Sequence, residues 1–94
     1  MVQNQDLIDM IRIEGHTDNR SIHTTQFQDN WDLSVARASN ALRYMLDSGR
    51  IDVTKISAVG YGEYHPVFPN DSDENRAANR RVDFVIESLR TIDN

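Results

Sequence analysis

The sequence contains no cysteine, and this absence excludes disulfide bonds, thiolate metal ligands and cysteine nucleophiles. Basic residues are also scarce, because 10 Lys and Arg stand against 15 Asp and Glu, for a formal net charge of -5. A general affinity for nucleic acid or for an anionic membrane surface is therefore not expected. No apolar run approaches the ~20 residues that a membrane-spanning helix needs.

What remains is the composition of one small domain. Ninety-four residues are enough for a single core, and 38% hydrophobic with 27% charged residues is ordinary for a globular chain. Residues 11–15 alternate as a strand, with Ile11 and Ile13 on its buried face. Two further strands are predicted over residues 55–61 and within residues 80–89.

The clearest helix is predicted over residues 30–49. Asn30 is the expected N-cap, and Gly49 supplies the C-terminal stop. Apolar residues at alternating steps of four and three predict one core-facing stripe, made of Trp31, Val35, Ala38, Leu42 and Met45. A second, short helix is predicted from residue 73 or 74 to about residue 79. The order strand, helix, strand, short helix, strand predicts an α/β (α+β) two-layer sandwich with the helices on one side of the sheet.

The first strand ends in the polar run Gly15-His16-Thr17-Asp18-Asn19, whose side chains could form three kinds of site. His16, Asp18 and His23 are possible metal ligands, but two histidines seven positions apart in a loop lack the short spacing of zinc sites. A hydrolase needs a nucleophile beside a base, or two opposed carboxylates, and neither pattern is present. We therefore expect no metal, no cofactor and no catalytic residue.

The third kind of site is a binding site for a zwitterion. Asp18 follows the first strand, and Arg37 lies two turns above Asn30 on the helix. If helix and strand pack antiparallel, the two charges border one groove and could hold a ligand's ammonium and carboxylate. The alternatives are that the two residues pair with each other, or that Asp18 caps its own turn. Spacing alone leaves these alternatives open.

Two other motifs lie close to this groove in the expected fold. In "AVGYGE", Gly60 and Gly62 lack the third glycine of a dinucleotide fingerprint and indicate close backbone approach instead. In "NRRVDF", strand alternation places Arg80 and Arg81 on opposite faces, so only one of them can face a shared site.

Four blocks in order, "IEGHTDN", "NWDLSVARA", "VGYGEYHPV" and "NRAANRRVDFVI", resemble the OmpA-like peptidoglycan-binding domain over residues 11–86. Within this family, the segment 27–34 and the long loop before it are most similar to the C-terminal domain of flagellar stator proteins of the MotB, MotS and PomB types. The resemblance implies a non-catalytic domain that binds the diaminopimelate residue of the peptidoglycan stem peptide. It implies that Asp18 and Arg37 are the ligand-binding pair, that Asn30 is the motif asparagine, that Leu33 offers a backbone contact, and that supporting or rim contacts come from Thr17, Asn79 and Arg81.

The resemblance also implies a setting. Residues 1–94 would be a single OmpA-like βαβαβ domain that lacks the family's first strand in this fragment. It would lie in the periplasm or cell-wall zone as part of an inner-membrane protein. Its partners would be peptidoglycan, a second copy of the chain, and a MotA-type stator subunit reached through a transmembrane region outside this sequence. The alternative within the family is an outer-membrane tether of OmpA or Pal type.

Overall fold

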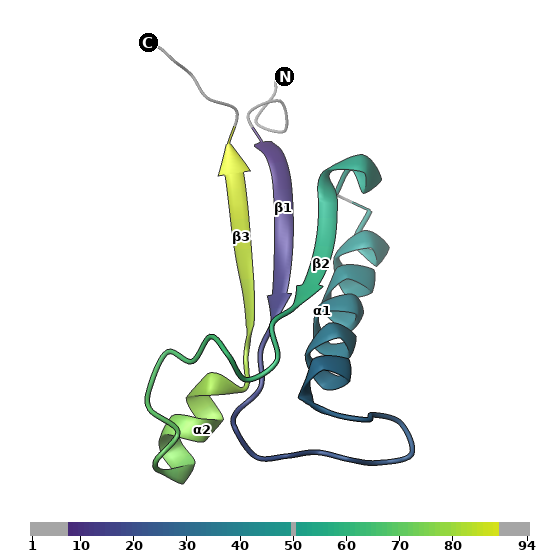
Figure 1. Ribbon diagram of the computed structural model, residues 1–94. Coiled ribbons are helices and arrows are strands. Elements are labelled where there is room, and N and C mark those ends of the chain that lie inside the picture. Colours follow the sequence, from purple (N-terminus) through teal and green to yellow (C-terminus); the bar gives the residue numbers. More distant parts are fainter. Residues whose placement is uncertain (1–7, 50, 89–94) are drawn as a thin grey trace.

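The computed structural model describes residues 8–49 and 51–88 (Figure 1). In chain order its elements are β1 (Ile8–Gly15), α1 (Asn30–Asp47), the short 3-10 helix η2 (Val53–Lys55), β2 (Ile56–Gly60), α2 (Asp73–Asn79) and β3 (Val82–Ser88). This is the mixed α/β arrangement that the sequence predicts. Among the described residues, no helix combines the length and the apolar character that a membrane span requires.

The three strands form one sheet in the order β2-β1-β3. β1 runs parallel to β2, with Ile13 opposite Ala58, and antiparallel to β3, with Ile13 opposite Phe84. The parallel pair needs a long crossover, which α1 provides. The carboxyl ends of β1 and β2 therefore open at the same edge of the sheet. There the loops after both strands meet α2 and the start of β3 (Figure 1).

The core lies between α1 and the sheet. Ile11 and Ile13 are buried as predicted, and Ala38 of α1 is buried against them. The predicted helix stripe is wrong in its first two members, because Trp31 is 49% and Val35 48% exposed. In the first part of α1 it is Ser34, fully buried, that faces the sheet.

Two glycines explain why a serine takes this place. A Cβ on Gly15 would overlap the main-chain carbonyl oxygen of Ser34, and a Cβ on Gly60 would lie 2.6 Å from its hydroxyl. α1 therefore approaches the backbones of β1 and β2 more closely than a large side chain between them would allow. The Ser34 hydroxyl donates to the Trp31 carbonyl at 3.0 Å and accepts from the Gly62 amide at 2.9 Å. The close approach predicted for Gly60 is confirmed, and it fixes the start of α1 against the strand ends.

The cap of α1 differs from the prediction by one residue. Asp29 is the N-cap, and its carboxylate accepts from the Asp32 amide at 3.0 Å. Asn30 is the first helical residue, so its side chain is not used for capping. Gly49 has a φ of 74°, which suits the predicted stop, although the C-cap itself is Ser48.

α2 does not cover the sheet, contrary to the expectation that both helices lie on one face. It lies beyond the strand ends (Figure 1). α2 is seven residues long, and two residues separate its end at Asn79 from the start of β3 at Val82. This short link keeps α2 next to the start of β3, at the edge where the polar loops gather.

Candidate ligand-binding site

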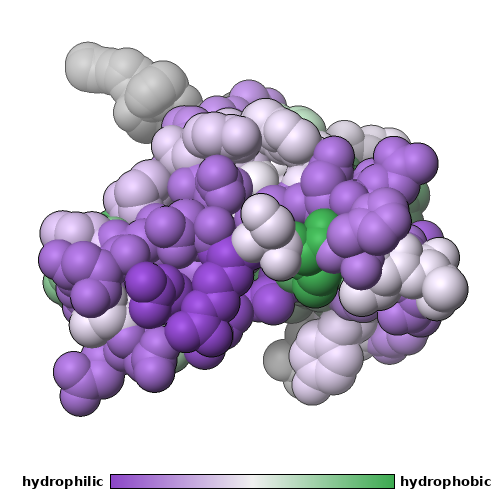
Figure 2. Space-filling view, turned by 60° about the horizontal axis from the view of Figure 1, so that its bottom comes forward, coloured by the Kyte–Doolittle hydropathy of each residue, from purple (hydrophilic) through white to green (hydrophobic). Residues whose placement is uncertain are grey.

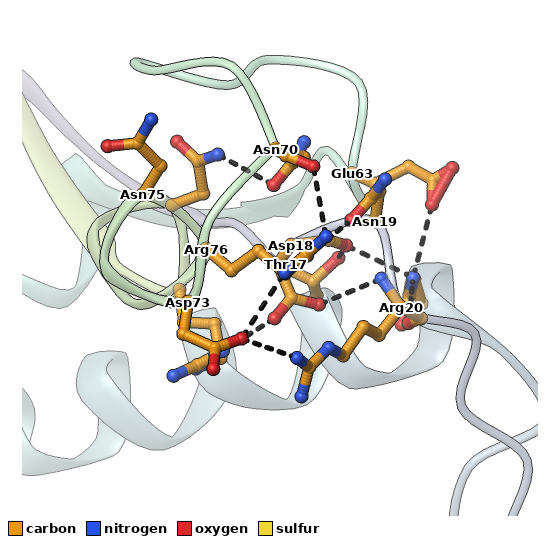
Figure 3. Close-up of polar contacts among 12 residues, drawn as sticks. Thr17, Asp18, Asn19, Arg20, Glu63, Asn70, Asp73, Asn75 and Arg76 are labelled. Carbon is orange, nitrogen blue, oxygen red and sulfur yellow. Dashed lines mark hydrogen bonds and ion pairs between the residues drawn. The ribbon is translucent and has the colours of Figure 1, made fainter.

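A cluster of polar and charged residues occupies the edge where β1 and β2 end (Figure 3). At its centre is Asp18, which is only 6% exposed. Its Oδ2 accepts from Nη1 of Arg80 at 2.6 Å, and its Oδ1 accepts from the Arg20 amide at 3.0 Å. Asp18 therefore does cap its own turn, one of the alternatives considered above. Its ion-pair partner is Arg80 rather than Arg37.

Asn30 ties the loop after β1 to the loop after β2. Its Nδ2 lies 3.0 Å from the Arg20 carbonyl and 3.3 Å from both the Asp18 carbonyl and Oε1 of Glu63. Thr17 is buried, and its hydroxyl donates to the Asp18 carbonyl at 2.8 Å. The structure thus brings together three of the residues that the resemblance singled out, Thr17, Asp18 and Asn30.

Arg37 is in a different position. It is partly buried on α1, seven positions after Asn30, and it forms neither a hydrogen bond nor an ion pair with any described residue. Every other arginine that the structure describes has at least one hydrogen-bond partner: these are Arg12, Arg20, Arg43, Arg76, Arg80 and Arg81. Leu33, also partly buried, uses its amide on the Asp29 carbonyl at 3.2 Å. Among the arginines that the structure describes, Arg37 therefore differs in having no protein partner.

Asn79 and Arg81 hold a loop instead of facing Asp18. Asn79 is fully buried, and its amide makes four hydrogen bonds, to the amides of Val67 and Phe68, to the Phe68 carbonyl and to Oδ1 of Asn70. Because an asparagine amide offers about four such positions, none remains for a ligand. Arg81 contacts Asp83 and the His65 carbonyl. Both residues shape the loop beside the site.

Residues absent from the predicted set complete the cluster. Two of them are Arg80, which pairs with Asp18, and Glu63, which accepts a hydrogen bond from Asn30. The others form a charged rim, in which Oδ1 of Asp73 lies 2.6 Å from Nη2 of Arg20 and 3.3 Å from Nη1 of Arg76 (Figure 3). The motif "NRRVDF" did signal that one of its two arginines could reach the site. It did not show which one, because Arg80 belongs to the turn after α2 and not to the strand.

A hollow of about 310 Å³ adjoins the cluster on the other side of Asn30. Its lining consists of Ser21, Ile22, Asp29, Asn30, Trp31, Glu63 and Tyr64. The rings of Trp31 and Tyr64 lie 5.3 Å apart at an angle of 30° and form an aromatic wall. Figure 2 shows that the face of the molecule carrying the strand ends is mainly hydrophilic, with one small apolar patch.

Known proteins are similar to this chain in both sequence and fold. Motility protein B of Bacillus subtilis is 47% identical over 76 residues, which are 81% of this chain and 29% of that protein. A MotB-like protein from Desulfovibrio vulgaris is 49% identical, with a TM-score of 0.76 over 83% of this chain and 50% of the solved chain. The cell wall anchor of the T6SS from Pseudomonas aeruginosa is 35% identical, with a TM-score of 0.76 over 87% and 57% of the two chains.

The chain thus spans less than a third of motility protein B and about half of these solved chains. The model of the OmpA family matches residues 1–80, which include β1, α1, β2 and α2. The four sequence blocks, the sheet order and the match of the family model agree, and the chain belongs to the OmpA family.

Proposed function

We propose that this domain binds the stem peptide of peptidoglycan through its diaminopimelate residue and thereby anchors a flagellar stator complex to the cell wall. The observation that carries the proposal is Arg37, a partly buried arginine without a hydrogen-bond or ion-pair partner among the described residues. It lies two turns along α1 from Asn30, which contacts the Asp18 loop. The likeness to motility protein B favours the stator anchor over an outer-membrane tether.

The chemistry of the ligand matches these groups. The far end of diaminopimelate carries both a carboxylate and an ammonium. Arg37 can take the carboxylate in a bidentate pair, which a planar guanidinium does better than a lysine. Asp18 uses two of about four acceptor positions on Arg80 and Arg20, so its carboxylate can accept from the ammonium as well. Thr17 and Asn30 hold the Asp18 loop in place, and Leu33 lies between Asn30 and Arg37 on α1.

The proposed ligand also sets the location and the partners. Peptidoglycan lies outside the cytoplasmic membrane, so the domain would act in the periplasm or cell-wall zone as the extracytoplasmic part of an inner-membrane protein. A MotA-type subunit would associate through a transmembrane region outside these residues, and a second copy of the chain would complete a dimer. The cell wall anchor of the T6SS, which shares the fold, supports this kind of role. The domain would bind the wall without cleaving it, and incubation with peptidoglycan should release no soluble fragments.

Retention of the 94-residue chain on purified peptidoglycan tests the site. We expect Arg37→Gln and Asp18→Asn each to weaken retention roughly ten- to hundredfold, because each removes one charge-assisted contact worth about 1.5–3 kcal/mol. Arg43→Gln is the matched control. Arg43 is an exposed arginine on the same helix, and its side chain contacts Asn40. The Arg43→Gln variant should therefore bind peptidoglycan as the unmodified chain does.

A loss of binding must be distinguished from a loss of folding in each variant. Thermal unfolding followed by circular dichroism shows whether each variant is folded before its retention is compared. Equal retention of all folded variants would overturn the assignment of Asp18 and Arg37. Failure of the unmodified chain to bind diaminopimelate-containing peptidoglycan, under conditions where it is folded, would overturn the function itself.

A further inference from the structure

His16 directly follows β1 and is 2% exposed. Its ring stacks on Tyr61, with centroids 5.4 Å apart and an interplanar angle of 13°. Among the described residues, neither ring nitrogen has a hydrogen-bond partner. An unsatisfied buried polar group costs about 1–3 kcal/mol, so such groups in folded proteins usually have a partner. The ring nitrogens of His16 therefore have no hydrogen bond to the described residues that a ligand would have to displace.

Two carboxylates face this imidazole. Oε1 of Glu14 lies 3.6 Å from its Nε2, and Oδ2 of Asp83 lies 3.5 Å from the same atom. The sheet places all three residues: Glu14 is two positions before His16, and Asp83 is directly opposite Glu14 on β3. The ladder continues past β1, because the His16 amide donates to the Arg81 carbonyl at 2.9 Å. The three side chains lie on the sheet face opposite the buried Ile13, away from α1.

The distances among the three atoms suit one metal ion. Oε1 of Glu14, Nε2 of His16 and Oδ2 of Asp83 all lie within 4.8 Å of one another. Two ligand atoms that are each about 2.1 Å from a tetrahedral Zn²⁺ lie about 3.4 Å apart. The observed 3.5 and 3.6 Å need little movement to reach that value. We propose that Glu14, His16 and Asp83 bind a divalent transition-metal ion, with Zn²⁺ as the ion of choice.

The donor set selects the class of metal. Imidazole nitrogen with two carboxylate oxygens suits Zn²⁺ and its neighbours, whereas Mg²⁺ and Ca²⁺ prefer oxygen ligands alone. The imidazole would bind the ion through the lone pair of one ring nitrogen.

The surroundings orient the ligands and leave one position open. Nε of Arg12 donates to the other oxygen of Glu14 at 2.9 Å, and Nε of Arg81 donates to both oxygens of Asp83, at 3.2 Å to Oδ1 and 3.0 Å to Oδ2. These contacts hold the two carboxylates in place, as outer-sphere partners do in metal sites. The positive charges of the two arginines lower the affinity for the metal ion. The Asp83 side chain is 41% exposed, so a water molecule can complete a fourth position from that side. The site uses none of the residues of the proposed peptidoglycan site and does not depend on that function.

Titration of the 94-residue chain with ZnCl₂ at pH 7 tests the site, with the ¹⁵N resonances of the His16 ring and isothermal calorimetry as readouts. We expect one equivalent of Zn²⁺ to shift the His16 resonances. Asp83→Asn and Glu14→Gln should each weaken binding at least about tenfold, as loss of even an outer-sphere partner does in known sites. Glu87→Gln is the matched control, since Glu87 is an exposed carboxylate on the same strand that contacts Arg12 instead.

The His16 resonances separate this site from weak binding at the exposed His23 and His65. Thermal unfolding of each variant establishes that the two amide substitutions, which keep side-chain shape, are folded. Unchanged His16 resonances in excess ZnCl₂ would overturn the proposal and leave the imidazole as a buried residue between two carboxylates. Binding by folded Asp83→Asn that equals binding by the unmodified chain would also overturn it.

Discussion

Replacement of Gly15 by alanine is expected to lower the free energy of unfolding by about 3 kcal/mol or more. The added Cβ would overlap the main-chain carbonyl oxygen of Ser34, and backbone on both sides cannot move aside as a flexible side chain can. Overpacking typically costs about 1–3 kcal/mol, and contact between rigid backbones belongs at the upper end of that range. For a domain of this size the loss lowers the melting temperature by roughly 12–24 °C, which thermal unfolding followed by circular dichroism measures.

Gly49→Ala is the matched control for this prediction. Gly49 has a φ of 74°, yet a Cβ there would meet no atom within 4 Å. Its replacement therefore carries only the conformational cost of alanine in the left-handed region, about 1 kcal/mol. A Gly15→Ala variant no less stable than Gly49→Ala would show that α1 is not held against β1 as closely as the structure has it.

Asn79→Ala is expected to lower the free energy of unfolding by ~3 kcal/mol and to loosen the loop before α2. The substitution removes four hydrogen bonds from a fully buried amide and leaves the amides of Val67 and Phe68 without their acceptor. Hydrogen exchange measured by NMR should show loss of protection at these two amides in particular. Chemical denaturation gives the global loss.

Asn75→Ala provides the comparison within the same helix. Asn75 also lies in α2, but its side chain makes one exposed hydrogen bond, to Oδ1 of Asp71 at 3.0 Å. Surface changes of this kind stay within about 0.5 kcal/mol. If Asn75→Ala and Asn79→Ala had the same effect, or if Val67 and Phe68 kept their protection in Asn79→Ala, the structural role given to Asn79 would be wrong.

The sequence was most informative where local periodicity decides the structure. Alternation of Ile11 and Ile13 identified β1 and its buried face, and both residues are buried. The order of elements predicted the mixed α/β class, although not the antiparallel pairing of β3 with β1, and the polar run after β1 predicted that Asp18 follows the strand end. These features depend on neighbours in the chain, so periods of two and 3.6 residues reveal them.

Features that depend on distant residues were not predictable in this way. The spacing of apolar residues placed Trp31 and Val35 in the core, but backbone contacts at Gly15 and Gly60 turn Ser34 inward instead. The pair of Asp18 and Arg80 joins residues 62 positions apart. The carboxylate of Asp83 likewise reaches His16 only because β3 pairs with β1, which spacing along the loop does not reveal.

The short link between α2 and β3 has a consequence for engineering this domain. Asn79, Arg80 and Arg81 are consecutive, yet they hold the loop at Val67, the carboxylate of Asp18 and the carbonyl of His65. One residue inserted between Asn79 and Arg81 would change the register of these side chains relative to one another, so that they could not all keep their partners, although surface connections usually tolerate insertions. The exposed stretch at residues 23–26 has no comparable set of contacts with distant residues, so it is the better place to attach a fluorophore or an affinity tag.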